Sequence, residues 1–321
     1  MNQPQPQSEQ EALVDRPPTR FRIFINRHGE MRAGWRMVLF VLVLAVLSVL
    51  LVRPIVFLFP GVDVLIPSCM FLAALLASSW VMTRFVNRKP FGAVGLGLHQ
   101  RTMREFGMGC LLGFLMMASI FLIQLGLGYL TFGSLGLTWA AAAGRVALAA
   151  LFFLVAAAGE ELMFRGYFFQ TFMQGITFLP AALIMSLLFG ASHLANPHVT
   201  TFAAINVALA GLWFSFAYLK TRSLWFPIGL HASWNFCQTT MFGFSTSGQE
   251  FHGRTIFTNV VSGPQWLTGG AFGPEGGALA TLALIISTWF IIKSGLITAP
   301  EGVVTLDSIE DLILPSVAKE Q

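Results

Sequence analysis

The stretch MVLFVLVLAVLSVLLV, residues Met37–Val52, decides the fold class of this chain. It carries no charged side chain, and a helix needs about 20 mostly apolar residues to cross the hydrocarbon core of a bilayer. The whole chain has the same character: 55% of its 321 residues are hydrophobic and 11% are charged, with a mean hydropathy of +0.71. Ordinary soluble domains carry roughly a quarter charged residues. We therefore predict an all-α fold, a polytopic transmembrane helical bundle.

Further apolar stretches bring the expected number of spans to about eight. They are Val64–Met82, Phe106–Phe132, Trp139–Gly159, Phe178–Leu194, Phe202–Leu219, Leu224–Phe244 and Ala278–Ile292. The Gly- and Phe-rich segment Ser245–Gly277 is too polar to span and is the longest external connection. A connection of this length is usually functional or disordered. We expect either a lid or a flexible external loop.

The basic residues orient these spans. Arginines gather before the first span, and lysines or arginines follow the second, sixth and eighth spans. The alternate connections are poor in basic residues, with Arg53 and Arg254 as exceptions. Because cytoplasmic loops carry an excess of Lys and Arg, we expect both termini to be cytosolic, in a multi-pass protein of a bacterial cytoplasmic membrane. Residues 1–36 are then a flexible N-terminal tail and residues 294–321 a solvated C-terminal tail.

Cysteine and charge exclude other classes of protein. Cys69, Cys110 and Cys237 lie in apolar runs without CxxC spacing, so they indicate neither a disulfide framework nor a zinc knuckle. The net charge of +4 comes from basic residues at the ends of apolar runs. We therefore expect no nucleic-acid partner.

Three polar clusters interrupt the apolar spans. They are EELMFR at Glu160–Arg165, FGASH at Phe189–His193 and HASWN at His231–Asn235. The two adjacent glutamates of the first cluster are the only acids in residues 106–249. Ionisable side chains at membrane depth cost several kcal/mol, and they are by default functional.

Helical spacing predicts how these side chains face. Glu161 and Arg165 are four residues apart, so they share a helix face and can pair. Glu160 lies about 100° around the helix and faces elsewhere. His231 and Asn235 fall one turn apart on a single face.

The three clusters together suffice for peptide hydrolysis. Glu160 can act as general base toward water, and His193 can orient that water. His231 and Asn235 can donate to a developing oxyanion. Ser192 directly precedes His193, so the two side chains should diverge on a helix, which gives a serine mechanism little support.

Two other interpretations stay open. Glu160, His193 and His231 could hold Zn²⁺ with an open fourth position, although the sequence requires no cofactor. Each cluster alone also fits a structural role, since glutamates that close a helix are often interfacial and membrane histidines often bond between helices.

The motifs EExxxR, FxxxH and HxxxN, in this order on successive spans, resemble the CPBP family of CAAX proteases and bacteriocin-processing enzymes, which includes the type II CAAX prenyl endopeptidases. The resemblance covers about residues 145–292. It implies an intramembrane protease with a catalytic cavity between core helices. Members of the family have been described both as metalloproteases and as metal-independent glutamate-type proteases.

The resemblance also implies a role for each motif residue. The catalytic positions are Glu160, His193, His231 and Asn235. By this likeness the glutamate activates water and the His–Asn pair of the third motif stabilises the oxyanion. Glu161 and Arg165 match the supporting positions of the first motif.

The predicted division is three helices in residues 37–132 followed by a catalytic core in residues 133–293. We expect an endopeptidase that acts on a membrane-associated peptide, either CaaX-like or leader-type, with the lipid bilayer as its other partner. A non-catalytic adaptor or immunity protein is the alternative, and a transporter is a further one. The small-residue spacing Gly109–Gly113 allows close helix contact within this chain or with another copy, so the oligomeric state stays open.

Overall fold

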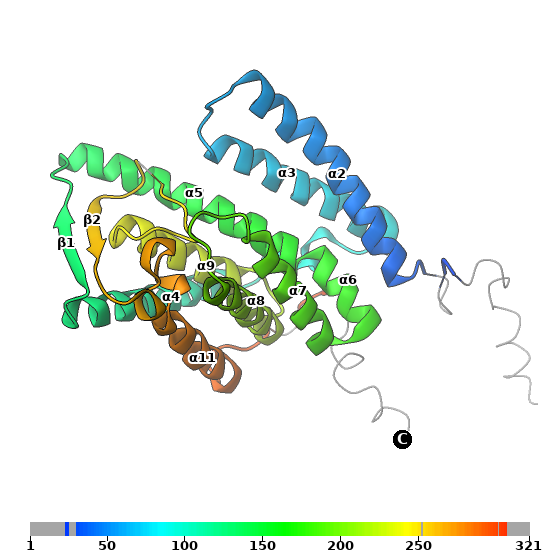
Figure 1. The fold of residues 1–321 in the computed structure, drawn as a ribbon. Coiled ribbons are helices and arrows are strands. Elements are labelled where there is room, and N and C mark those ends of the chain that lie inside the picture. Colours follow the sequence, from blue (N-terminus) through cyan, green and yellow to red (C-terminus); the bar gives the residue numbers. More distant parts are fainter. Residues whose placement is uncertain (1–22, 26–29, 252, 301, 307–321) are drawn as a thin grey trace, which may run out of the picture.

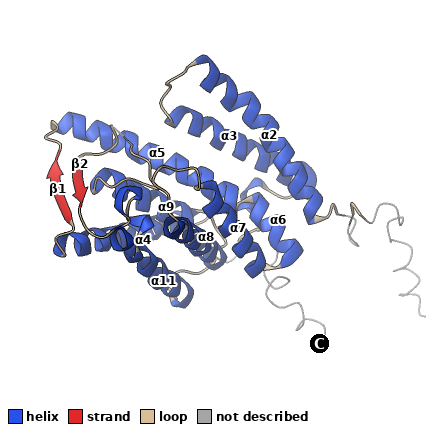
Figure 2. Ribbon diagram, viewed as in Figure 1, coloured by secondary structure: helices blue, strands red, loops and turns tan. Residues whose placement is uncertain are grey.

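The computed structural model describes residues 23–25, 30–251, 253–300 and 302–306, and it shows a helical bundle with one small sheet (Figures 1 and 2). The helices are α2 (Ala33–Leu58), α3 (Leu65–Val81), α4 (Thr102–Gly126), α5 (Trp139–Arg165), α6 (Tyr167–Ile176), α7 (Phe178–Ser192), α8 (Thr201–Thr221), α9 (Trp225–Phe236), α10 (Gln265–Thr268) and α11 (Ala278–Lys293). Strands β1 (Leu130–Ser134) and β2 (Phe257–Val261) pair antiparallel. The predicted fold class is confirmed.

Five helical stretches are long and apolar enough to cross a membrane. They are α2, α3 with the π-helical turn Met82–Asn87 that follows it, α4, the continuous stretch of α5 and α6, and α8. The apolar helices α7 and α11 are shorter, as is α9. Each of the eight predicted spans overlaps one of these helices, and the protein is an integral membrane protein.

The third predicted span, Phe106–Phe132, was placed too far along the chain at its C-terminal end. Helix α4 ends at Gly126, because Gly128 adopts a left-handed conformation with φ of 71°. The amides of Gly128 and Tyr129 donate to the carbonyls of Leu125 and Gln124, a pattern that closes helices at a left-handed glycine. The chain then turns into strand β1, which faces β2 from the far loop.

Helices α4 and α9 form the closest contact of the core. A Cβ added at Gly113 would lie 2.5 Å from the carbonyl oxygen of Leu230, and one added at Gly109 would lie 2.3 Å from that of Phe226. Only glycine allows this approach. The small-residue stripe on α4 is therefore filled by α9 of the same chain, which fixes the helix that carries the third motif.

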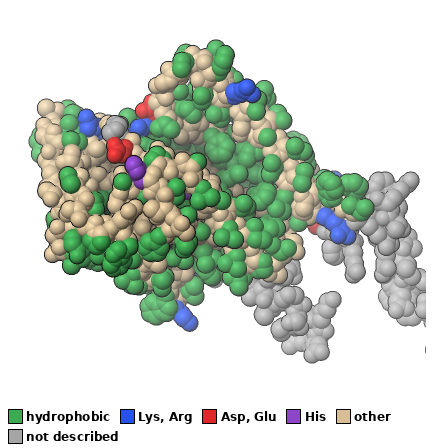
Figure 3. All heavy atoms as spheres, viewed as in Figure 1, with side chains coloured by type: hydrophobic (Ala, Val, Ile, Leu, Met, Phe, Trp, Pro, Cys, Tyr) green, Lys and Arg blue, Asp and Glu red, His purple; other side chains and the backbone are tan. Residues whose placement is uncertain are grey.

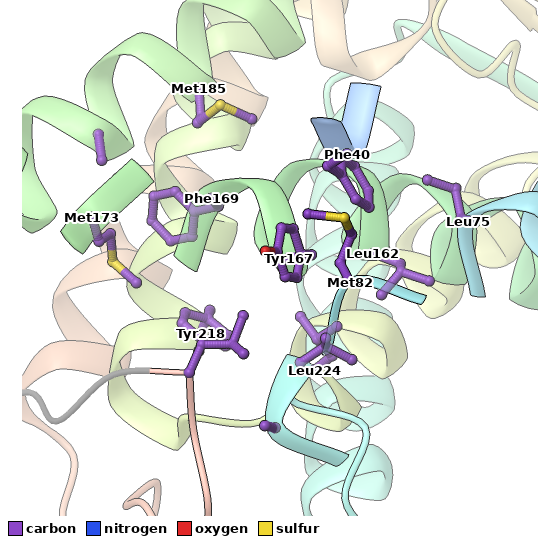
Figure 4. Close-up of a cluster of buried hydrophobic side chains, with 14 of the residues drawn as sticks. Phe40, Leu75, Met82, Leu162, Tyr167, Phe169, Met173, Met185, Tyr218 and Leu224 are labelled. Carbon is purple, nitrogen blue, oxygen red and sulfur yellow. The ribbon is translucent and has the colours of Figure 1, made fainter. Parts of the chain in front are cut away.

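Helices α2 and α3 form a hairpin beside α5 in the upper part of Figure 1. A buried cluster joins this hairpin to α5, α6, α7 and α8 (Figure 4). Phe40 of α2 stacks on Tyr167 of α6, with ring centroids 5.1 Å apart. Many exposed side chains of the hairpin are apolar, among them Leu42, Leu50 and Phe57. In Figure 3 hydrophobic side chains are spread over the visible face, and charged ones appear only in small patches. This is the surface expected of a chain that faces lipid.

The segment Ser245–Gly277 is more structured than a plain external loop. It contains β2 and α10, and it buries the ring of Phe272 completely. Gln238 donates a hydrogen bond to the carbonyl of Ser245, and Asn196 donates one to the carbonyl of Ser247. These contacts hold the segment against α9 and the end of α7. Whether it moves as a lid stays a prediction.

The C-terminal segment after α11 is only partly a solvated tail. Ile297 and Leu306 are buried, and Lys89 donates hydrogen bonds from its amine to the carbonyls of Thr305 and Leu306. The expectation of a fully solvated segment from residue 294 is therefore wrong as far as Leu306, because apolar side chains there find a place in the core. Residues 307–321, and most of the predicted tail 1–36, lie outside the described residues.

Candidate active site

A cavity of about 540 Å³ lies between the core helices, as the family resemblance implies. Its walls come from α3, α5, α7, α8, α9, the start of α11 and the segment Ser245–Gly277. All four predicted catalytic residues line it: Glu160, His193, His231 and Asn235. Most of the remaining wall is aromatic or aliphatic. The fold thus gathers polar side chains from α5, α7 and α9 in one largely apolar chamber.

Glu161 and Arg165 form the predicted pair at the end of α5. The Nη1 of Arg165 lies 3.2 Å from Oε1 of Glu161, and both side chains are fully buried. The Nη2 of Arg165 donates to the carbonyl of Gly211 on α8 at 2.9 Å. The guanidinium also lies against the rings of Phe189 and Phe214, at 4.8 and 5.0 Å from their centroids. Glu161 is therefore paired with a buried guanidinium that is itself fixed by a hydrogen bond and two aromatic rings.

Glu161 in turn orients His231. The Nδ1 of His231 lies 2.9 Å from Oε1 of Glu161, and because an ionised carboxylate only accepts hydrogen bonds, Nδ1 is the donor. The ring stacks on Phe214, with centroids 4.5 Å apart and planes inclined by 23°. The opposite nitrogen, Nε2, lies 3.8 Å from Oε2 of Glu160. The buried series Arg165–Glu161–His231 thus presents one imidazole nitrogen to Glu160.

Glu160 faces the cavity, whereas its neighbour Glu161 faces the protein. Its side chain is 36% exposed, against 0% for Glu161. The predicted difference in facing is confirmed. Helix α5 continues beyond the predicted span end at Gly159 to Arg165, so Glu160 lies within the helix rather than at its tip. Its Oε2 has no hydrogen-bond partner among the described residues.

His193 closes helix α7 and is not part of it. The residue is the C-cap, with φ of −100° and ψ of 0°. Its Nδ1 lies 2.8 Å from the carbonyl oxygen of Phe189, one turn back. Because a carbonyl oxygen only accepts, Nδ1 carries the proton. Nε2 is then the nitrogen left for the cavity.

The expected divergence of Ser192 from His193 is wrong. Their Oγ and Nδ1 atoms lie 3.1 Å apart, because His193 has left the helical conformation. Ser192 Oγ also donates to the carbonyl of Phe189 at 2.8 Å. Two donors that share one acceptor are not a nucleophile and its base, so this contact gives no support to a serine mechanism.

Asn235 is the freest polar group of the site. Its side chain is half-buried and lines the cavity one turn beyond His231. Its amide makes no hydrogen bond with any part of the chain that the structure describes. An amide in this state keeps both donors for a ligand.

Sequence reasoning missed Glu275. This residue belongs to the segment Ser245–Gly277 and lines the same cavity. Its Oε1 accepts from Nε1 of Trp234 at 3.1 Å, and its Oε2 accepts from both the amide and the hydroxyl of Ser247 at 2.6 Å. The Nδ2 of Asn206 donates to its backbone carbonyl. The only available signal was an acid in a long connection, which a solvent loop explains equally well.

Metal binding by Glu160, His193 and His231 finds no ready geometry. Within residues 23–306, wherever the structure describes them, no group of three or more His, Cys, Asp or Glu side chains is placed to hold a metal ion. The hydrogen bond between Glu161 and Nδ1 of His231 leaves Nε2 of that ring facing Glu160. Metal binding by these three residues stays a prediction.

Comparison with known proteins places the three motifs within one family model. The family model "Type II CAAX prenyl endopeptidase Rce1-like" matches residues 142–237, which contain all three motifs. The "Uncharacterized protein YyaK" of Bacillus subtilis is 26% identical over 219 residues, which are 64% of this chain and 70% of that protein. The "Putative membrane peptidase YdiL" of the same organism is 33% identical over 76 residues, 24% of this chain and 29% of that protein. No solved structure matches this chain. Residues 142–237 of this integral membrane protein are therefore similar to the Rce1-like type II CAAX prenyl endopeptidases.

Proposed function

We propose that this protein is an intramembrane endopeptidase in which Glu160 activates water. The observation that carries the proposal is the arrangement of Glu160 and His231. One carboxylate is open to the cavity, and the imidazole beside it is fixed by a buried Glu161–Arg165 pair. The family match and the printed name of the relative YdiL support the same class of reaction.

Glu160 takes the role of general base. A water held between its carboxylate and the Nε2 of His193 loses a proton to the carboxylate as the oxygen attacks the peptide carbonyl carbon. Such positioned proton transfer contributes about 10²–10⁴-fold in rate. The protonated Glu160 then returns that proton to the leaving amine, and the peptide bond breaks.

Asn235 and His231 stabilise the negative oxygen of the tetrahedral intermediate. The Asn235 amide has free donors within the described chain, and His231 donates through Nε2 when its ring is doubly protonated. In that state each ring nitrogen faces a carboxylate, Glu161 on one side and Glu160 on the other. Donors aimed at a developing charge in a site that excludes water are worth more than in water.

The substrate class is a membrane-associated peptide, CaaX-like or leader-type. The cavity has room for a short extended segment, and its walls are mostly apolar. The start of α2 and the segment after α11 both contact α6: Gln174 accepts a hydrogen bond from Arg36 and donates one to the carbonyl of Leu306. This arrangement supports placing both termini on one side of the membrane, which the distribution of basic residues makes the cytosolic side of a bacterial cytoplasmic membrane.

The proposal is tested with purified protein in liposomes and a panel of membrane-tethered peptides, some ending in CaaX-like sequences and some of leader type. Wild type, Glu160→Gln and Glu30→Gln, an exposed glutamate outside the cavity, are assayed with and without a chelator. We expect cleavage by wild type and Glu30→Gln in both conditions, and cleavage about 10²–10⁴-fold slower by Glu160→Gln.

If wild type cleaves without the chelator but not with it, the mechanism is metal-dependent rather than glutamate-type. Equal cleavage by Glu160→Gln would remove Glu160 from the mechanism. A wild type that cleaves no peptide of the panel would favour the adaptor, a membrane protein that keeps the motifs as structural hydrogen bonds.

A further inference from the structure

The charges of the cavity are one-sided. Its formally charged lining residues are the two carboxylates Glu160 and Glu275, and its two histidines are His193 and His231. Neither Lys nor Arg occurs among the described residues that line it. A substrate group at this place therefore meets negative or neutral protein groups.

Two arginines lie against aromatic rings of the cavity wall, and both are held in ion pairs. Arg165 is fully buried behind the rings of Phe189 and Phe214 and is bonded to Glu161. The Nη2 of Arg254 lies 2.5 Å from Oδ1 of Asp63. Its guanidinium lies over the ring of Phe152, which lines the cavity. Neither can reach a substrate carboxylate without breaking its own ion pair.

The carboxylate of Glu275 is held in a fixed position by hydrogen bonds. It accepts three hydrogen bonds, and all three donors are neutral groups of Trp234 and Ser247. It forms no ion pair within the described chain. An ionised carboxylate has about four acceptor positions, so at least one remains for a ligand, and no cation among the described residues forms an ion pair with it.

The position of Glu275 ties it to the reaction. Its partner Trp234 lies on α9 between His231 and Asn235, directly before the latter. Asn206 of α8 holds the backbone of Glu275 at the same time, through two hydrogen bonds to the carbonyls of Glu275 and Gly277. The carboxylate is thus fixed in the wall of the same cavity as His231 and Asn235, and a peptide that spans about 3.3 Å per extended residue can reach from one to the other.

We propose that Glu275 is a specificity-determining residue that selects a cationic Lys or Arg side chain of the substrate close to the scissile bond, and that a substrate carboxylate at the same place is disfavoured. The inference deepens the proposed protease function, on which the mention of a scissile bond rests. It favours leader-type or internal peptide segments with a basic residue over segments whose free C-terminal carboxylate must enter the cavity.

The test is a binding measurement that does not depend on turnover. Fluorescent membrane-tethered peptides carry Lys, Gln or Glu at one position, which is moved in turn through four residues on either side of the central bond. Their affinity is measured for the Glu160→Gln protein in liposomes. We expect the Lys peptide to bind roughly tenfold more tightly than the Glu peptide at one position, and Glu275→Gln in the same background to reduce that ratio to within about twofold.

Matched variants separate charge from loop packing. Ser247→Ala removes one hydrogen bond to Glu275 and Trp234→Phe removes another, and neither changes the charge of the cavity. Both should keep most of the tenfold ratio. An unchanged ratio in Glu275→Gln would overturn the inference, as would an equal loss in all three variants or a Lys-to-Glu ratio near one throughout.

The two proposals fail in different ways. If the wild type cleaves nothing but the Glu275-dependent charge ratio is present, the protease function fails and the cationic ligand stands. If the wild type cleaves through Glu160 but every peptide ratio stays near one, the function stands and the role of Glu275 fails.

Discussion

The long helix α2 and the short helices α7 and α9 have different surroundings in this bundle. Helix α2 is 26 residues long, and only 11% of its most apolar window is buried within the protein. Helices α7 and α9 have 15 and 12 residues, and they carry or cap two of the three motifs. Helix α2 presents most of its surface to lipid, whereas α7 and α9 end near the cavity and place His193 and His231 there.

The ends of the short helices show why they are short. Helix α7 stops so that His193 can turn back and bond to the carbonyl of Phe189. Helix α9 passes into a π-helical turn at Cys237–Met241, directly after Asn235. Such turns are frequent at functional sites. The cavity, rather than the thickness of the bilayer, sets the length of these elements.

The largest expected effect lies behind the short helix α9. Arg165→Met leaves Glu161 buried without its cation, and breaking a buried pair in this way costs about 3–5 kcal/mol. We expect a corresponding loss in the free energy of unfolding, measured in detergent, and loss of peptide cleavage. The double variant Glu161→Leu with Arg165→Met should recover part of the stability but no cleavage, because His231 still lacks its orienting partner. An Arg165→Met variant as stable and as active as wild type would contradict this role of the Glu161–Arg165 pair.

Next in size is a catalytic effect without a structural one. Asn235→Ala should reduce the cleavage rate by about 10²–10³-fold and change the free energy of unfolding by less than about 0.5 kcal/mol. Its control is Asn206→Ala, which removes hydrogen bonds to Glu275, Gly277 and Thr281. That variant should lose about 1–3 kcal/mol of stability. Equal destabilisation by both would show that Asn235 is structural.

A smaller effect is expected at the contact of α4 with α9. Gly113→Ala brings a Cβ to 2.5 Å from the carbonyl of Leu230, and overpacking of this kind costs about 1–3 kcal/mol. Gly107→Ala on the same helix meets nothing within 4 Å and should be neutral or slightly stabilising. Thermal unfolding of the two variants compares them directly. Equal melting temperatures would mean that the contact gives way easily.

The smallest effect belongs to the lipid-facing side of α2. Leu42 is 58% exposed, so Leu42→Ala should change stability by less than about 0.5 kcal/mol and leave cleavage unchanged. Phe40 is fully buried on the same helix and stacks on Tyr167. Phe40→Ala should cost about 3–5 kcal/mol. A large effect at Leu42 would point to a protein partner on this face.

Hydropathy predicted the short helices α7 and α11 to within two residues at each end, but it misplaced the ends of α2, α4 and α9. Hydropathy sees a stretch such as Leu224–Phe244 as one span, but it does not see that α9 ends at Phe236. The strand at Leu130–Ser134 escaped notice because its partner lies more than a hundred residues away and its first three residues continue the apolar run of α4.

In the site, contacts within one helix could be predicted from the sequence, whereas contacts between distant segments could not. Helical spacing was enough to predict the Glu161–Arg165 pair and the different facing of Glu160, since both follow from one helix. The bond from His231 to Glu161 joins two helices 70 residues apart, and Glu275 comes from a loop. Neither the His231–Glu161 bond nor the position of Glu275 follows from residue spacing within one helix.

The central claim is that Glu160 is the base, and the most direct measurement is the single-turnover rate of peptide cleavage by Glu160→Gln beside wild type. Glu160 makes no hydrogen bond through its Oε2 within the described chain, so the variant should unfold at the same temperature as wild type. We predict a loss of about 10²–10⁴-fold in rate. A rate within twofold of wild type, in a protein of equal stability, would contradict the mechanism.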